Sequence, residues 1–496
     1  MRKHFVALAA LAGLVLPGTN PAGAASLGLP LPAPVPVVAS DNIELVATFP
    51  EVGAISTAFA SDEPYMYVNT LNGITVYDIS DPALPIPTGV LPMPHFENEA
   101  MALGERGDTK FVLVGIDLYA ATPTKDPTNV NPGFGYELIV VDVTDPAAPT
   151  IRGRTETSSS VHTIQCVDEG CNYAYTSGAY DNGRFHAIDL TDLDSPKEVA
   201  ELHNVAGDGH QWDHAGNDVL WSTGGDGAAA YDVSDPLAPQ LLASTNEQGR
   251  QSPYNDFIMH NSFHPNADQL THEIVENEDG SETSLTTGAP DIFAGNVLLV
   301  TEEDYVDPTC EGGEGTFSTW HIPYLDADQS AKDNPEARRD MGKMVPLDNW
   351  NSELMDTGED TIAGALCSAH YFTYHDAGFI AQGWYQQGTR ILDVRDPADI
   401  KQVGYFFAGA SETWHAYWVP ERDAEGKVTG RDTNIVYTND AVRGIDVLQV
   451  TLPTSEPEET EDLKAPILKG WLNPNKLKAS KPSARFGYLC RIPGTL

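Results

Sequence analysis

Short runs of alternating apolar and polar residues recur along most of this chain, and a turn follows each run. β-Branched and aromatic residues fill the runs, as is typical of half-buried strands. Each run ends in Asp, and the following turn contains a second Asp and a Pro, which fixes φ and ends the strand ladder. The copies are GITVYDISDPALP ending at Pro85, LIVVDVTDPAAP ending at Pro149, FHAIDLTDLDSP ending at Pro196, AAAYDVSDPLAP ending at Pro239 and TRILDVRDPADI ending at Ile400.

Two further strand-like runs precede each copy and a short apolar stretch follows it, so the repeating unit contains four strands. Four-stranded units that recur roughly every 40 to 60 residues, with Gly-rich turns, are typical of β-propeller blades. We therefore predict an all-β fold, a seven-bladed β-propeller. Its blades are expected to start near Ile55, near Glu99, and at His162, His210, His260, His370 and His415, with an acidic insertion at 268–288 in the fifth.

The last predicted blade is one strand short, and residues 42–50 at the other end of the propeller form a strand without a blade. An N-terminal strand that filled this gap would close the ring and remove two exposed sheet edges. The propeller is therefore assigned to residues 42–450. A Pro- and Ala-rich leader at 25–41 precedes it, and a tail at 451–496, expected to be loosely attached, follows it.

Residues 1–24 have the pattern of a cleaved signal peptide. Arg2 and Lys3 supply a positive start, an apolar run continues to Leu16, and small residues stand at 22–24. The mature protein is therefore expected to be secreted, periplasmic or at the cell surface. No later stretch approaches the roughly 20 apolar residues of a membrane helix, so a chain that does not span the membrane is expected.

The repeated strand also resembles a known repeat. LIVVD at 138–142, with ITVYD at 74–78 and TRILD at 389–393, is similar to the LVIVD repeat of exported bacterial and archaeal proteins. The resemblance extends over roughly 42–450 and implies a β-propeller. It implies no activity, because the family has none in common and propellers host many unrelated functions.

Five of the 14 histidines stand at the start of a predicted first strand. First strands line the central channel of a propeller, so side chains at one depth form a ring. Glu97, Asn98 or Glu99 offers the matching position in the second blade, and Ser56 or Thr57 in the first. Because imidazole is the commonest metal-ligand side chain, this ring predicts a transition-metal site. The predicted ligands are His162, His210, His260, His370, His415 and Glu99.

Copper or iron is favoured for this site, and zinc is an alternative. Two seven-bladed groups are similar in architecture, although no motif is shared closely enough to transfer a residue. Carotenoid-cleavage oxygenases hold iron with histidines from separate blades, and the methanethiol oxidase and selenium-binding group is associated with copper. These likenesses imply oxidation of a small molecule, whereas zinc would activate water. Two other interpretations stay open: structural histidines hydrogen-bonded to Asp, Ser and Thr, as in WD-repeat propellers, and a non-catalytic secreted binding or adhesion module.

Charge restricts the partners. Asp and Glu number 72 against 28 Lys and Arg, which gives a formal net charge of -44. Such a field repels nucleic acid and anionic membranes and attracts cations. A small-molecule or cell-surface ligand and a monomeric protein are expected.

Five cysteines are too few for a disulfide scaffold, but an oxidising compartment permits pairing. Cys166 and Cys171 flank a turn-like VDEG, Cys310 and Cys367 form the second predicted bridge, and Cys490 is left over. Packing or hydrogen bonding is expected for His214, His264 and His375. A place on loops near the channel mouth is expected for Glu302, Glu303, Tyr180, Asp181, Tyr385 and Arg443.

Overall fold

The computed structural model describes residues 37–95, 98–117, 136–178, 183–207, 209–245, 258–276, 278, 280, 282–304, 315–323, 325, 343–353, 367–409 and 411–466. The predicted signal peptide at 1–24 and most of the predicted leader lie outside these residues.

Antiparallel strands that pair in chain order build almost all of the described chain. Four sheets have four strands, one has five, and one has eight. The eight-stranded sheet consists of two four-stranded meanders joined by a two-residue parallel contact between β18 and β24. Divided there, the described strands form seven four-stranded units.

The first three units follow one another along the chain. They are β3 (Ala54–Phe59), β4 (Tyr65–Thr70), β5 (Gly73–Asp78) and β6 (Ile86–Pro92); β7 (Ala102–Arg106), β8 (Thr109–Asp117), β9 (Tyr136–Asp142) and β10 (Thr150–Glu156); and β11 (Thr163–Cys166), β12 (Tyr173–Ser177), β13 (Arg184–Asp189) and β14 (Lys197–His203).

The next three units contain the acidic insertion. They are β15 (Gly209–Gly216), β16 (Val219–Gly224), β17 (Gly227–Asp232) and β18 (Gln240–Thr245); β19 (Ile258–Phe263), β22 (Val297–Glu303), β23 (Phe317–His321) and β24 (Lys343–Trp350); and β25 (Ala369–His375), β26 (Phe379–Trp384), β27 (Gly388–Asp393) and β28 (Lys401–Ala408). The insertion forms a hairpin of its own, β20 (His272–Glu276) with β21 (Glu282–Thr286).

The last unit joins the two ends of the propeller. Strands β29 (Thr413–Arg422), β30 (Val428–Asp440) and β31 (Gly444–Val450) are completed by β2 (Ile43–Phe49). β2 pairs antiparallel with β31, from Ile43 opposite Val450 to Phe49 opposite Ile445. The predicted closing strand is therefore present.

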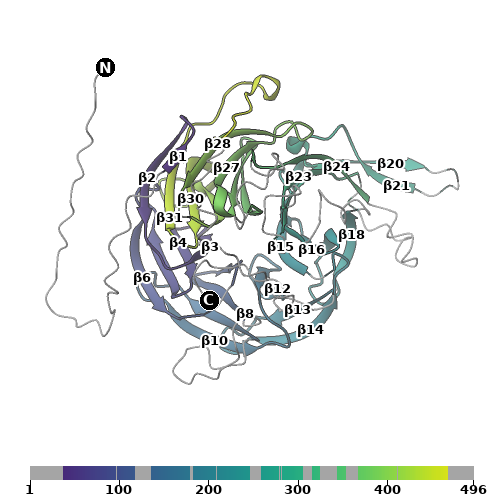
Figure 1. Ribbon diagram of the computed structural model, residues 1–496. Coiled ribbons are helices and arrows are strands. Elements are labelled where there is room, and N and C mark those ends of the chain that lie inside the picture. Colours follow the sequence, from purple (N-terminus) through teal and green to yellow (C-terminus); the bar gives the residue numbers. More distant parts are fainter. Residues whose placement is uncertain are drawn as a thin grey trace, which may run out of the picture. The chain divides into compact units, whose positions relative to one another are not determined.

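The units follow one another around a ring, with strands such as β3 and β15 toward the inside and β6, β10 and β14 toward the outside (Figure 1). Apolar faces of neighbouring sheets pack on each other. Tyr67 and Val76 of one unit, for example, share a core cluster with Val112 and Val141 of the next, and all four side chains are fully buried. Burial of a Val side chain contributes about 1.5–3 kcal/mol, so contacts between sheets hold the ring together. The β-propeller prediction is confirmed.

The repeated sequence forms the third strand of five units, β5, β9, β13, β17 and β27. The Asp after each strand caps the turn that follows. Asp81 Oδ1 accepts a hydrogen bond from the Ala83 N–H at 3.0 Å, and Asp145 Oδ1 accepts one from Ala147 at the same distance. A side chain that hydrogen-bonds its own backbone two residues on stabilises a turn, which explains why Asp recurs there.

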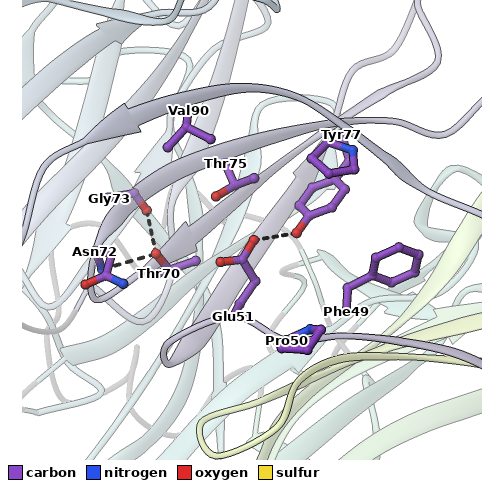
Figure 2. A pocket seen from close by; sticks show the side chains of 10 residues that line it. Phe49, Pro50, Glu51, Thr70, Asn72, Gly73, Thr75, Tyr77 and Val90 are labelled. Atoms are coloured by element: carbon purple, nitrogen blue, oxygen red, sulfur yellow. Dashed lines mark hydrogen bonds between the residues drawn. The ribbon is translucent and has the colours of Figure 1, made fainter. Parts of the chain in front are cut away.

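The segment that leads from β2 to β3 contacts the neighbouring sheet at a surface cavity. Tyr77 on β5 donates a hydrogen bond to the Glu51 carboxylate, and Phe49 lies edge-on to the same tyrosine ring at 6.1 Å (Figure 2). On the other side of this cavity, Thr70 Oγ1 donates to the Gly73 carbonyl at 3.0 Å. The contacts of Tyr77 with Glu51 and Phe49 fasten the closing strand to the first unit.

Both boundaries of the predicted propeller need adjustment. Val37–Ala39, expected within the leader at 25–41, forms β1, which pairs with the open edge of β28. The described part of the tail, residues 451–466, is hydrogen-bonded to the propeller. Leu463 N donates to the Gln402 carbonyl at 2.8 Å, and Ala465 N donates to Glu353 Oε1 at 2.7 Å. Residues 451–466 are therefore attached to the propeller, unlike the loose tail expected.

One predicted disulfide lies wholly within the described residues. Cys166 and Cys171 are bonded, with an S–S distance of 1.98 Å. Cys367 is also disulfide-bonded, whereas its predicted partner Cys310 and the fifth cysteine, Cys490, lie outside the described residues. Among the residues that the structure describes, no helix has the length and hydrophobicity to cross a membrane.

Candidate metal centre

Four of the five predicted histidines meet around the carboxylate of Glu99. Glu99 Oε2 lies 3.2 Å from His162 Nε2, 3.1 Å from His210 Nε2 and 3.2 Å from His260 Nε2. Its other oxygen, Oε1, lies 3.5 Å from His370 Nε2. All five side chains are buried. Imidazoles from four different four-stranded units thus direct Nε2 at one carboxylate.

β-Bulges place three of these rings. Pairing between β15 and β16 passes from Gly209 to Gln211, so His210 is the extra residue of a bulge. In β19 the pairing passes from Met259 to Asn261 and leaves out His260. In β25 the irregularity covers His370 and the residue after it. A bulge bends the strand and re-aims the extra side chain, which here directs it into the channel centre.

The opposite ring nitrogen of three histidines has a fixed acceptor. His162 Nδ1 lies 2.9 Å from Asp117 Oδ2, at the end of β8. His210 Nδ1 lies 2.8 Å from the His260 carbonyl, and His370 Nδ1 lies 2.9 Å from the Trp414 carbonyl. Because a carbonyl only accepts, Nδ1 carries the proton in His210 and His370, and the lone pair of the neutral ring is on Nε2. Metal-binding histidines are oriented in this way.

A second buried carboxylate, that of Glu303, borders the cluster. Glu303 Oε2 lies 3.6 Å from His260 Nε2, and Oε1 lies 3.8 Å from His370 Nε2. Tyr385 donates a hydrogen bond to Glu303 Oε1. The sequence placed Glu302, Glu303 and Tyr385 on rim loops, but all three are 1% exposed. Glu302 accepts hydrogen bonds from the backbone N–H groups of residues 315 and 316.

The electrostatics of the cluster favour positive charge at its centre. Burial alone would lower the pKa of His162, but the charges of Glu99 and Asp117 raise it well above its usual value. Burial would also lower the pKa of His370, but the charge of Glu99 outweighs burial. The pKa of His370 is therefore raised. Burial would raise the pKa of Glu99, yet the nearby His162 and His370 hold it well below its usual range. The same negative charge would stabilise a bound cation.

The pKa values of the neighbouring groups are shifted in the direction that favours their neutral forms. Burial, followed by the charges of His210 and His370, lowers the pKa of His260 well below its usual value, and burial also lowers that of His210. Burial is the main cause that raises the pKa of Glu303 to about 7. Burial thus favours neutral His210 and His260, whereas the Glu99 carboxylate favours charged His162 and His370.

His415 does not join the four rings, so its assignment to the same register is wrong by one residue. Pairing between β29 and β30 passes from Thr413 to His415, which makes Trp414 the bulged residue. Trp414 therefore occupies the position that histidine has in the other sheets, and its ring lies 5.2 Å from that of His370. His415 lies one residue further along and stacks on Tyr371, with ring centroids 4.6 Å apart and an interplanar angle of 11°.

The other sequence candidates are placed as follows. His214 Nε2 lies 2.8 Å from the Cys166 carbonyl oxygen. His264 Nε2 lies 2.7 Å from the Gly295 carbonyl oxygen. His375 packs edge-on against Trp418, so packing and hydrogen bonding are confirmed for these three. The Arg443 guanidinium pairs with the Asp446 carboxylate at 2.8 Å. Tyr180, Asp181 and Glu97 lie outside the described residues.

The cluster fits a metal ion geometrically. Its donor atoms form overlapping groups, each with all atoms within 4.8 Å of one another: Glu99 with His260 and His370, Glu99 with His162 and His210, and His210 with His260 and Glu303. Zinc-type bonds to nitrogen are about 2.0–2.1 Å long, so two ligands of one ion are roughly 3–3.5 Å apart. The distances of 3.1–3.5 Å from Glu99 to the four Nε2 atoms lie in this range.

The fold and this centre define a class, a β-propeller with a buried histidine and carboxylate cluster on its channel. The LVIVD repeat model matches residues 60–90 and 133–157. The chain is therefore a β-propeller in which these two segments match the LVIVD repeat.

Structural comparison supports the fold alone. The β-propeller domain of Cps50 (Swd1) from Myceliophteria thermophila is similar, with a TM-score of 0.51 and 12% sequence identity over 82% of this chain and 100% of that domain. No curated protein sequence matches the chain.

Proposed function

We propose that this protein binds a transition-metal ion between the Nε2 atoms of His162, His210, His260 and His370, beside the Glu99 carboxylate. The observation that carries the proposal is the direction of the rings. Acceptors at Nδ1 hold His162, His210 and His370 so that Nε2 faces Glu99.

Copper or iron suits the donor set best. Imidazole binds zinc, copper and iron, but a structural zinc site is satisfied by four ligands, and this centre offers four imidazoles and at least one carboxylate. Bound copper or iron would supply one-electron chemistry, and we propose oxidation of a small molecule with dioxygen as the electron acceptor. On the pattern of residues 1–24 we also propose that the protein acts after export.

Metal titration of two histidine variants tests the site. Untagged protein, treated with a chelator and then titrated with copper, ferrous iron and zinc, is expected to bind one equivalent of its metal. His260→Ala should weaken binding by more than about 100-fold, because loss of a ligand exceeds the 10–100-fold cost of losing an outer partner. Calorimetry gives the affinities, and elemental analysis gives the stoichiometry.

His415→Phe is the matched control, because it removes a buried channel imidazole that lies outside the cluster and retains an aromatic ring. This variant should bind metal as the wild type does. A folded wild-type protein that binds no metal, or equal loss in both variants, would contradict the proposal and favour a non-catalytic binding propeller.

Asp117→Asn is expected to have an intermediate effect. The Asp117 carboxylate fixes His162 through Nδ1 at 2.9 Å without reaching the centre. An amide at this place removes the negative charge that makes the imidazole a better ligand, so metal affinity should fall about 10–100-fold with the stoichiometry unchanged. Calorimetric titration checks this. An unchanged affinity would show that Asp117 plays no part in orienting His162.

A further inference from the structure

A second cavity, of about 400 Å³, lies along the channel beside the histidine cluster. Its lining residues directly follow the cluster residues on the first strands: Gln211 follows His210, Asn261 follows His260, and Tyr371 follows His370. None of the four cluster histidines lines it. The Tyr371 ring separates the two sites, with its centroid 4.3 Å from that of His260 and 4.6 Å from that of His415.

The lining of this cavity carries acidic side chains. Asp213 and Asp432 line it, and its described lining contains neither Lys nor Arg. Burial is the main cause that raises the pKa of Asp213 to about 7, although hydrogen bonds from Ser262 N and Oγ partly oppose it. Asp213 is half-buried. A carboxylate that is partly removed from water without a cationic partner is costly, and a positively charged ligand would offset that cost.

Stacked rings form one wall. His415 lies between Tyr371 and Tyr417, with ring centroids 4.6 Å and 3.6 Å away. The Phe59 ring meets Tyr417 edge-on at 6.0 Å. Aromatic faces beside carboxylates are the surroundings in which proteins bind organic cations, because the ring quadrupole attracts positive charge.

Two lining side chains also leave acceptors without partners. Gln211 Oε1 and Asn261 Oδ1 are buried and receive no hydrogen bond, although their side chains are only 5% and 3% exposed. Buried polar atoms are nearly always paired, so a ligand that donates hydrogen bonds is indicated. The surface cavity of Figure 2 differs, because its Tyr77 and Glu51, and its Thr70 and Gly73, are paired with each other.

We propose that the channel cavity binds a small protonated organic amine, its ammonium group near Asp213 and the amide oxygens of Gln211 and Asn261, and its body against Tyr371 and Tyr417. The charge of the lining selects a cation, the unpaired oxygens select an N–H donor, and the rings select a compact apolar body. This site is distinct from the metal centre and does not depend on it.

Benzylamine is the probe, titrated calorimetrically at pH 8 into chelator-treated protein. Saturable binding of one equivalent at sub-millimolar concentration is expected. Benzyl alcohol and benzoate, which have the same ring but no positive charge, should bind at least about tenfold more weakly, a difference of about 1.4 kcal/mol. Because the protein is metal-free, the result is separate from that of the metal titration.

Asp213→Asn should weaken benzylamine binding at least about tenfold, since an amide retains an acceptor for Ser262 but loses the charge. Asp218→Asn removes the same charge from an exposed turn of the same sheet and should change nothing. Equal binding of benzylamine and benzyl alcohol, binding of D-glucose in preference to both, or no binding to folded wild type would each overturn the proposal. Circular dichroism confirms that both variants are folded.

Discussion

Glu99→Gln should lower the affinity for the bound metal by about 100-fold or more, because it replaces the one ionised carboxylate that faces all four Nε2 atoms with a neutral amide. At a metal concentration 1,000 times the wild-type Kd, the metal stabilises the folded protein by about 4 kcal/mol. A 100-fold weaker site would retain about 1.4 kcal/mol of this. Thermal unfolding with and without metal measures the difference.

Glu412→Gln is the control for this change. Glu412 is another fully buried carboxyl group, and its Oε1 accepts a hydrogen bond from Trp414 Nε1 at 3.1 Å. Burial raises its pKa well above the usual range, so the neutral acid already resembles an amide. Metal-dependent stabilisation should therefore be retained. If Glu99→Gln retained it as well, Glu99 would not be part of the site.

Removal of the closing strand should have the largest effect on stability. A chain that starts after residue 50 lacks β2 and exposes the β31 edge, where Ile445 and Val447 are fully buried in the complete fold. Loss of one strand from a four-stranded unit should cost more than about 5 kcal/mol, which is comparable to the whole stability of many domains. Chemical unfolding and size-exclusion chromatography should show an unfolded or aggregated protein.

A chain that starts at Asp41 is the comparison, because it loses β1 but retains β2. It should remain folded and monomeric. A synthetic peptide of residues 41–50 should restore folding to the shorter chain by pairing with β31, as added strands do at open sheet edges. Equal stability of the two truncated chains would show that β2 does not close the ring.

The fold could be predicted because its signal is repeated. Each unit carries the same alternation and the same Asp turn, and each turn is stabilised locally by bonds such as Asp81 to Ala83, so no distant contact has to be known. The closing strand could be predicted because the last predicted blade lacked one strand and residues 42–50 formed a strand without a blade.

The centre could be predicted only in part. The start of each first strand was the correct place for the four histidines, but a bulge moves the inward side chain by one residue, and pairing detail decides which residue that is. Trp414 therefore occupies the position predicted for His415. Asp117 was missed and Glu303 was placed on a rim loop, because both stand at strand ends, where a carboxylate is usually solvated.

The pairing of β2 with β31 also sets the order in which this molecule can fold. During synthesis Ile43 appears early, whereas Val450 appears only when almost the whole propeller has been made. Until then β2 has no edge to pair with, and the last unit cannot form. Since contacts between such distant residues close slowly, ring closure is expected to be the late and rate-limiting event. The nascent protein therefore carries open sheet edges for most of its synthesis, the period in which it most needs protection from aggregation.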